Sequence, residues 1–545
     1  MRMKNMKKAI SMTRLLLVPM VVLFAATAFA AAPGITSTGT ANTFNLTAQP
    51  ANLNQPDGSA VYSWGYGCVA GTTPTFAPAA IAGAACPTMQ VPGPTLIVTE
   101  GQTITVTLTN NLPTSAGNTS ILFPGFAVTS TGGAAGLLTQ EAVPGGSVTY
   151  SFVASSPGTR AYYSGTQGDL QVEMGLYGAI IVLPKTPVSL AACTNGDLQA
   201  SNLAAESHWG ESDFRLAPSA YDHAGTCYDR EYLFQFAEMD GNIHKQALAQ
   251  VQAIQASGAC LVSGVVTPGN PGCSLSVPTE PYHPSYFVIN GRSMPDDMDA
   301  NYGAEYPHQP YNGNPHMHPG EITLIRVIGQ GRWEHPFHEH ANHVRILARD
   351  GNLILSQNDS SKLAGILMFT TDTFPGQAFD GLFYFTGRGL NWDMYGHHGG
   401  ADTANPLAIL PCTPDANGYN TGATATTAVN YFEWCQDHNK PVQAAPFGDV
   451  ASGGPATLPD PDIFTNGAWY SGSPYLGPDA TTRATGPNST FLPSNTQANP
   501  SNERGWAFMW HSHNEREITT NNVFPGGMLM MMLVDSREFV IDESN

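Results

Sequence analysis

Apolar residues alternate with polar ones over long parts of the chain, and this period of two predicts β-strands. The segment from Pro92 to Pro113 contains two such runs around a Glu-Gly turn, and Ser147 to Gly165 contains two more. A further apolar run from Gly175 to Pro184 follows them. We therefore expect a first β domain at residues 31–185.

A second set of strand patterns begins at Glu231 and reaches the last residues of the chain. Within it, His318 to Gly331 repeats the strand-turn-strand pattern of the first domain, which indicates two copies of one unit. We expect this second domain at residues 229–545 and a linker or capping segment at 186–228.

Two stretches of the second domain lack a strand pattern. Residues 245–280 contain two cysteines and are predicted to form an excursion closed by a disulfide. From about residue 396 to residue 504 the chain is rich in Gly, Pro, Asn and Thr, which predicts a long insertion.

The composition agrees with a large, loop-rich, all-β protein, and the length favours two domains with long loop insertions. The 545 residues include 56 Gly and 42 Pro, with 42% hydrophobic and only 12% charged residues, so little favours long helices. The net charge of −20 argues against nucleic acid and anionic lipid as partners. It suits a cationic substrate, or simply keeps a surface with few charges soluble.

Residues 1–30 are predicted to be a secretory signal peptide. An apolar run follows a cationic start and ends in Ala28-Phe29-Ala30, a small-x-small cleavage pattern. No later stretch approaches the roughly 20 apolar residues of a spanning helix, so we expect no transmembrane segment after signal removal. The mature protein is expected to be periplasmic, at the cell surface or extracellular. The signal holds five cations, Arg2, Lys4, Lys7, Lys8 and Arg14, and their loss would bring the net charge from −20 to about −25.

The cysteine count favours disulfides over metal ligation. Eight cysteines in an exported chain form an even number, and none stands in C-x-x-C spacing. Sequential pairing is the simplest hypothesis, although spacing alone leaves the connectivity open. The pairs would be Cys68 with Cys86, Cys193 with Cys227, Cys260 with Cys273, and Cys412 with Cys435.

Two His-x-His segments are the strongest candidates for chemistry. His511 and His513 follow the apolar run Trp506 to Trp510, and on a strand they would share one face. His338 and His340 repeat this spacing in the segment WEHPFHEH, with His335 three residues earlier. Imidazole is a common ligand of copper and zinc, so the two pairs predict a buried four-nitrogen metal site. The alternative is four core histidines hydrogen-bonded to carbonyl groups.

Other candidates have a simpler structural explanation beside the functional one. The residues His316 and His318 suit a turn, and Met528 to Met532 suit core packing better than copper(I) binding. His397-His398 are adjacent and would face opposite ways on a strand. Glu515 and Glu517 are either proton donors at the site or solvated carboxylates.

The segment HPFHEH, paired with a late WHSH and then Gly527-Met528, resembles the copper-binding motifs of multicopper oxidases. The phrases VPGPTLIV and GLYGAIIV also resemble first domains of that family. The resemblance implies two cupredoxin-like Greek-key β-sandwich domains and copper as the cofactor. It places His335 at a type 1 copper position. It places four residues at positions of the trinuclear cluster: His338, His340, His511 and His513.

The chain departs from the family motifs at several ligand positions. Ser512 stands where the family has the type 1 cysteine, and Glu517 stands where the second type 1 histidine should fall. A hydroxyl cannot replace the soft thiolate of a blue copper site, so we expect no type 1 centre and a mononuclear or at most binuclear site. The four first-domain histidine positions hold Leu122, Pro124, Tyr163 and Gly165.

Three functions remain open at this point. We favour an exported copper-dependent oxidoreductase that uses the remaining histidine site, with a small reductant or a metal ion as substrate, and not an ordinary laccase. The alternatives are a copper-binding or sequestering protein without turnover, and a structural β-sandwich protein with a remnant site. The sequence leaves the substrate, the number of coppers and the oligomeric state undetermined.

Overall fold

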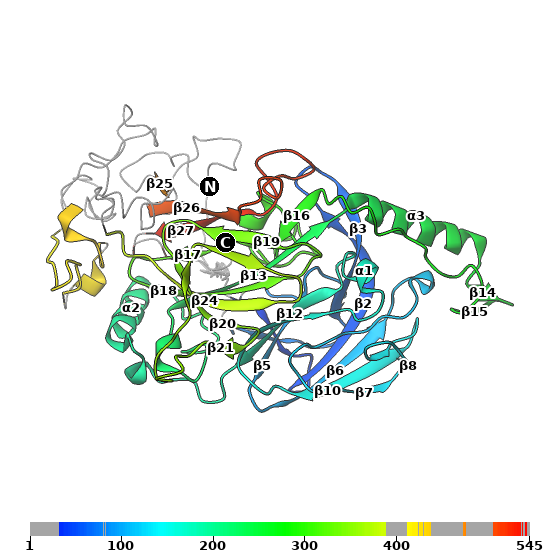
Figure 1. The fold of residues 1–545 in the computed structure, drawn as a ribbon, viewed down its shortest axis with the longest axis horizontal. Helices are drawn as coiled ribbons and strands as arrows, with labels where there is room; N and C mark the ends of the chain where they lie inside the picture. The colour runs from blue at the N-terminus through cyan, green and yellow to red at the C-terminus, as the bar shows by residue number, and fades with distance from the viewer. Residues whose placement is uncertain are drawn as a thin grey trace, which may run out of the picture.

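The structure is a computed structural model in which the chain forms two β-sandwiches side by side (Figure 1). The described residues are 32–388 apart from 80 and 82, 411–437 apart from 423, 424 and 429, 472–475, and 505–541 apart from 536, 538 and 539. The predicted signal peptide, His397-His398 and most of the predicted insertion at 396–504 lie outside them.

The first sandwich consists of two sheets, each of five strands in the described part of the chain. One sheet has the order β11-β12-β5-β1-β4 and contains Gly34–Ser37 (β1), Thr75–Ala77 (β4), Gly93–Thr99 (β5), Gly158–Tyr163 (β11) and Tyr177–Leu183 (β12). The other has the order β3-β2-β6-β10-β7 and contains Thr43–Asn54 (β2), Ala60–Cys68 (β3), Thr103–Asn110 (β6), Thr129–Gly132 (β7) and Ser147–Val153 (β10).

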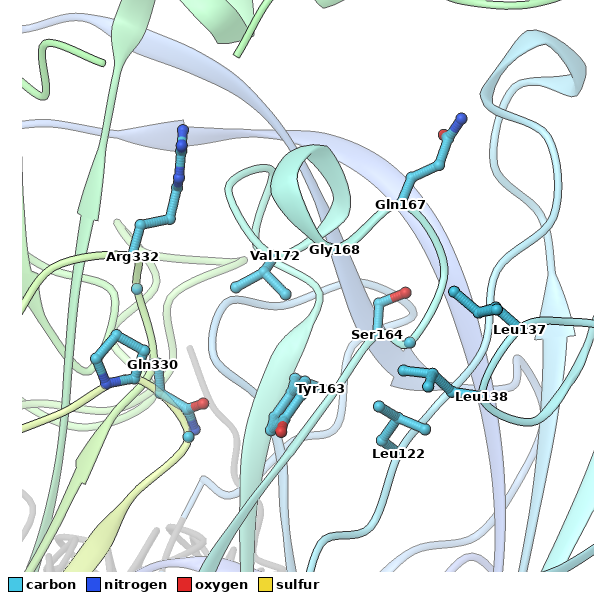
Figure 2. Close-up of a pocket in the computed structure, with 14 residues that line it drawn as sticks. Leu122, Leu137, Leu138, Tyr163, Ser164, Gln167, Gly168, Val172, Gln330 and Arg332 are labelled. Carbon is cyan, nitrogen blue, oxygen red and sulfur yellow. The ribbon is translucent and has the colours of Figure 1, made fainter. Parts of the chain in front are cut away.

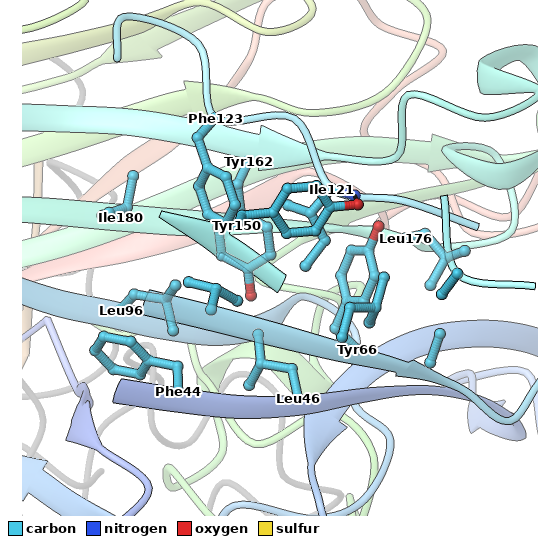
Figure 3. Packing of buried hydrophobic residues seen from close by; sticks show 14 of the residues in the cluster. Phe44, Leu46, Tyr66, Leu96, Ile121, Phe123, Tyr150, Tyr162, Leu176 and Ile180 are labelled. Atoms are coloured by element: carbon cyan, nitrogen blue, oxygen red, sulfur yellow. Dashed lines mark hydrogen bonds between the residues drawn. The ribbon is translucent and has the colours of Figure 1, made fainter. Parts of the chain in front are cut away.

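The alternation of apolar and polar residues determines which face of each sheet is buried. Along β6 and β10 every second side chain is buried, and the antiparallel register places Val148 opposite Leu108. Their apolar faces meet Leu96 and Ile180 of the other sheet in one core (Figure 3). The strands predicted in this region are therefore confirmed.

Short elements connect these strands. They are Thr114–Ala116 (η1), the hairpin of Ala134–Ala135 (β8) and Gln140–Glu141 (β9), and Gly168–Gln171 (α1).

The second sandwich is built in the same way from two sheets. One sheet has the order β16-β13-β18-β24-β20-β21, with β22 also on β20, and contains Arg230–Met239 (β13), Tyr286–Ile289 (β16), Ile322–Gly329 (β18), Val344–Arg349 (β20), Asn352–Leu353 (β21), Leu367–Met368 (β22) and Ala378–Tyr384 (β24). The other has the order β17-β27-β26-β19-β23, with β25 also on β26, and contains His316–Met317 (β17), His335–Glu339 (β19), Thr370–Thr373 (β23), Gly472–Tyr475 (β25), Gly505–Ser512 (β26) and Leu529–Asp535 (β27).

The two sandwiches share a pattern of strand pairing. In the first, β6 lies parallel to β2, and in the second, β18 lies parallel to β13. With two sandwiches and few helices, the all-β fold class predicted from the sequence is confirmed.

Two segments for which the sequence analysis predicted no helix form helices of 14 and 17 residues. One is Gly196–Trp209 (α2), in the segment between the domains, and the other is Gly241–Ser257 (α3), in the predicted disulfide excursion. Asp240 caps α3 by accepting a hydrogen bond from the Asn242 amide, and the helix ends at Gly258 in a left-handed conformation. The spacing of Ile243, Ala247 and Val251 gives α3 a buried stripe against the first sandwich. In the described residues no helix is long and apolar enough to cross a membrane.

The remaining short elements lie in loops. They are Leu190–Ala192 (η2), Ala224–Thr226 (η3), the hairpin of Leu261–Val262 (β14) and Val265–Val266 (β15), Asp296–Met298 (η4), Ala425–Thr427 (η5) and Cys435–Asp437 (η6).

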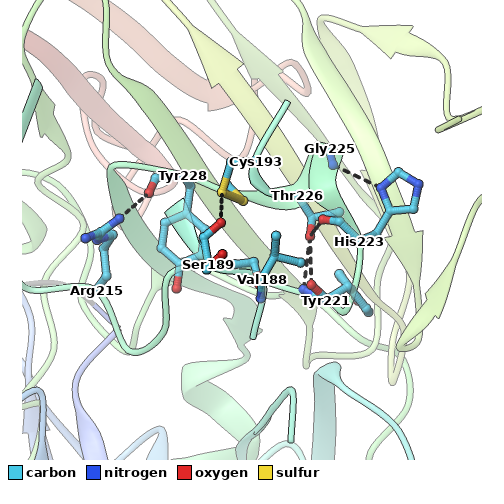
Figure 4. The surroundings of a disulfide bond; sticks show 11 residues. Val188, Ser189, Cys193, Arg215, Tyr221, His223, Gly225, Thr226 and Tyr228 are labelled. Atoms are coloured by element: carbon cyan, nitrogen blue, oxygen red, sulfur yellow. Dashed lines mark hydrogen bonds between the residues drawn. A yellow bond between two sulfur atoms is a disulfide. The ribbon is translucent and has the colours of Figure 1, made fainter. Parts of the chain in front are cut away.

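All eight cysteines form disulfides in sequential order, as predicted. Cys193 and Cys227 join the start of the α2 segment to the strand that follows it, and Arg215 donates a hydrogen bond to the Tyr228 carbonyl beside them (Figure 4). The other pairs are Cys68–Cys86, Cys260–Cys273 and Cys412–Cys435. Four disulfides are typical of a protein made for an oxidising compartment.

Candidate metal centre

The two His-x-His segments lie on neighbouring antiparallel strands. In the register of β19 with β26, His338 stands directly opposite His511. Phe337 alternates with His338 and packs into the core of the second sandwich against Trp510. Because successive side chains of a strand point to opposite faces, the histidines lie on the face away from this core. The sequence pattern therefore positions the imidazoles by burying the residues between them.

Three of the four histidines converge. Nitrogen atoms of His338, His340 and His511 all lie within 4.8 Å of one another, and all three side chains are buried. Nε2 of His340 lies 3.3 Å from Nε2 of His511. Metal ions bind imidazole nitrogen at about 2 Å, so these two residues would hold one ion together.

Hydrogen bonds set the orientation of two of these rings. Nδ1 of His511 lies 2.7 Å from the Ser512 carbonyl oxygen, which can only accept, so Nδ1 carries the proton and Nε2 keeps its lone pair. Nδ1 of His338 lies 2.6 Å from the Thr370 hydroxyl oxygen. A metal-binding histidine is ordinarily held by such a bond at its other ring nitrogen.

The clustered rings are neutral at physiological pH. Burial lowers the pKa of His338 to about 4, with a further contribution from the neighbouring His511 and His513. Burial, and then the positive charge that His511 would carry, lower the pKa of His340 to about 3. The pKa of His511 is also lowered, first by burial. Neutral imidazole is the form that binds metal.

His513 lies at the rim of the cluster. Its ring centroid is 4.8 Å from that of His338, but its side chain is 52% exposed and it stands outside the group of three. Phe369, partly exposed, packs its ring on His338 from the side of β23. The cluster thus lies just below the surface, with His513 at its opening.

His335 does not join the cluster. Its Nδ1 lies 2.9 Å from Glu517 Oε2 and its Nε2 lies 2.9 Å from Glu238 Oε2, so both ring nitrogens contact carboxylates. Burial lowers its pKa, but hydrogen bonds and charge interactions with the two carboxylates outweigh burial and raise the pKa to about 9. A protonated imidazole has no lone pair for a metal. This geometry does not support the prediction that His335 is a metal ligand.

Ser512 belongs to this second network. Its hydroxyl donates to Glu517 Oε2, which also faces His335. All three side chains are fully buried. The residues at the expected type 1 positions therefore form a hydrogen-bonded group in which each polar atom has a partner.

The residues at the positions of the family's first-domain histidines lie in a different site. Leu122 pairs with Tyr163 through two backbone hydrogen bonds, so these two positions are adjacent. Together with Gly165 they line a pocket to which His338, His340, His511 and His513 do not contribute (Figure 2).

The weaker candidates have structural partners. Nδ1 of His316 lies 2.7 Å from Asp535 Oδ2, and Nε2 of His318 lies 2.7 Å from Glu211 Oε1, both in buried pairs. Met528, Met530 and Met532 are core residues, as expected. Glu515 is exposed and its carboxylate lies 4.0 Å from His513 Nδ1.

Two residues of the site were not identified from the sequence. Glu238, the second carboxylate on His335, lies on the apolar strand β13, and a carboxylate inside a buried strand indicates a buried partner. Thr370, beside His338, lies on β23, and its position follows only from strand pairing.

Comparison with known proteins supports the resemblance seen in the motifs. Residues 84–187 match the family model described as multicopper oxidase. A multicopper oxidase of Talaromyces pinophilus is 33% identical over 124 residues, which is 22% of this chain and 20% of that protein. A laccase of Aspergillus fumigatus is 34% identical over 122 residues, 21% of this chain and 20% of the laccase. The matched segment thus spans about a fifth of the length of these relatives.

Solved structures of similar proteins include a blue copper oxidase from Nitrosomonas europaea. It is 14% identical, with 90% of this chain and 85% of that chain covered and a TM-score of 0.41. A copper nitrite reductase from the same organism is 18% identical, with 63% of this chain and 84% of that chain covered and a TM-score of 0.35.

Proposed function

We propose that this chain, a divergent member of the multicopper oxidase family, is an exported oxidoreductase that binds copper through His338, His340 and His511. His513 stands at the opening of the site and completes the set. The convergence of three buried, neutral imidazoles on adjacent strands is the observation that carries this proposal.

The donor set fits copper. Copper is the metal of this family, and imidazole sites rank copper(II) above zinc and nickel in affinity. Because the pKa values of His338 and His340 lie near 4 and 3, no proton has to leave these rings when a metal binds at pH 7. The Thr370 and Ser512 contacts hold two rings in place beforehand, which lowers the ordering cost of binding.

We further propose that the protein has no type 1 copper centre. Ser512, Glu517 and His335 bond to one another, and every cysteine is in a disulfide. No thiolate remains for a blue copper site.

The proposed substrate is a small reductant or a metal ion. Bound copper supplies one-electron redox chemistry. Without a cysteine-histidine bridge, electrons have to arrive at the histidine cluster itself. The half-exposed His513 and the partly exposed Phe369 border the approach, so a small molecule or ion suits this opening better than a bulky dye.

Copper sequestration without turnover is the second candidate. Among the described residues, His338, His340 and His511 are the one group of His, Cys, Asp or Glu side chains placed closely enough to hold a metal ion. A single site can hold copper without passing electrons onward.

Oxygen uptake by the copper-loaded protein distinguishes these functions. We expect uptake with ascorbate or cuprous ion, negligible uptake with a phenolic or diamine dye, and loss of both copper and uptake in H340A/H511A. The exposed His283 gives a matched control, H283A, which should behave as the native protein. Stoichiometric copper binding with no oxygen uptake would support sequestration, and rapid dye oxidation would contradict both proposals.

A further inference from the structure

A pocket of about 510 Å³ lies between the two sandwiches, apart from the histidine cluster. One side comes from the first sandwich, where residues 163–168 and the tip of the β8–β9 hairpin contribute (Figure 2). The other side comes from loops of the second sandwich at residues 330–332 and 375–376. The volume falls in the range of small-molecule sites, roughly 300–1,000 Å³.

The walls of the pocket are mainly apolar. Leu122, Val172 and Pro375 line it, together with Leu137 and Leu138 at the hairpin tip. Leu137 is 92% exposed and Leu138 is 64% exposed. Burial of these two exposed leucines against a ligand is favourable in free energy, because it removes apolar surface from water.

The polar end of Gln330 is engaged behind the wall. Its Nε2 donates to the Gly178 carbonyl and to Gln235 Oε1, at 2.8 Å each, and the side chain is buried. Gln330 Oε1 and Gln235 Nε2 are a buried acceptor and a buried donor on these two neighbouring amides, with no hydrogen bond to other described residues. The wall at Gln330 therefore presents little polar surface to a ligand.

The charges around the pocket favour a neutral ligand. Arg332 is the one charged residue in the lining, and its guanidinium already donates to the Thr279 carbonyl and to Glu280 Oε1. It also lies over the Tyr282 ring, 4.1 Å from the centroid. Little of its charge remains for an anionic group. Tyr163 adds a ring and a hydroxyl on the side that comes from the first sandwich.

We infer that this pocket binds a small, uncharged, apolar molecule. The molecule lies against Leu122, Leu138 and Val172. The pocket occupies positions that the family motif gives to first-domain histidines, but its lining suits an organic molecule and not a metal.

Indole and indole-3-acetate form a matched pair of probes, because they share a ring system and only the acetate carries a charge. We expect the mature, disulfide-intact protein to bind indole, and to bind indole-3-acetate at least about tenfold more weakly, since its carboxylate would leave water for an apolar wall. Calorimetry or ligand-observed NMR measures both affinities. Binding of indole should be the same in H340A/H511A, because those residues do not line the pocket.

A pocket-filling variant tests the location. Gly168 lines the pocket, and a Cβ placed there meets no atom within 4 Å, so G168W can fill the space without strain. Gly269 also has open space and lies in the loop closed by Cys260 and Cys273, which makes G269W the matched control. We expect G168W to lose indole binding and G269W to keep it. No indole binding at millimolar concentration, equal affinity for the two probes, or unchanged binding by G168W would each overturn the inference.

Discussion

The side chain that positions His338 is a threonine with no ionisable group. Thr370 lies on β23 directly opposite His338, and its hydroxyl contacts Nδ1 of the imidazole at 2.6 Å. Contacts of this kind fix the ring and raise its basicity, and their removal ordinarily costs tenfold to about a hundredfold in metal affinity.

We therefore expect T370V to bind copper at least about tenfold more weakly than the native protein, with an unchanged number of sites. The neighbouring Thr371 is fully buried, and its hydroxyl has no hydrogen-bond partner, so T371V is a control that changes the same atoms without touching the cluster. Titration against a competing chelator gives both affinities. Equal losses in the two variants would show that Thr370 acts only through packing.

Among the elements of the second sandwich, three are joined by the buried charge group around His335. Glu238 lies on β13, His335 begins β19, and Glu517 lies in the loop after β26. The cation between two carboxylates ties both sheets of the sandwich together. Removing one partner of a buried ion pair ordinarily destabilises a protein by about 3–5 kcal/mol.

This group predicts how stability depends on pH. The pKa of His335 rises from 6.5 to about 9 on folding, so its stabilising effect is complete below pH 6.5 and is lost as pH rises through about 9. The shift corresponds to about 3 kcal/mol of unfolding free energy.

Urea unfolding of the metal-free, disulfide-intact protein at pH 6.5, 8 and 9.5 measures this loss. We expect the free energy of unfolding of H335Q to be nearly independent of pH in this range. E517Q, which removes one carboxylate, should show a smaller pH dependence than the native protein. Parallel curves for the native protein and both variants would rule out the assignment of the proton to His335.

The sequence predicted the strands better than it predicted the connections between them. Alternation located β6 and β10 because a sheet with one buried face imposes a period of two, and a continuous apolar run located β26. The helix α3 was missed because its apolar stripe is short, although Asp240 and Gly258 gave cap signals.

The same difference applies to the candidate site. The spacing of His338, His340 and His511 was enough to bring them to one face. The contact of His335 with Glu238 depends on where two sheets meet, nearly a hundred residues apart in the sequence. Local periodicity carries no information on such a contact.

At the scale of the whole molecule, the two sandwiches hold two separate sites. The second sandwich holds the histidine cluster, and an apolar pocket lined by Leu122, Tyr163 and Gly165 lies between the sandwiches. Changing Ser512 to Cys would leave both Glu517 and the pocket residues in place. The architecture therefore favours the proposed copper site, with its smaller set of histidine ligands, over a full oxidase cluster.

Copper titration of the metal-free mature protein, with the bound metal counted per chain while the visible spectrum is recorded, tests this account most directly. We predict one tightly bound copper, or at most two, lost in H340A/H511A, and no intense absorption of a copper-thiolate bond in the native protein or in S512C. Three or four coppers per chain with a strong blue band in the native protein would contradict it.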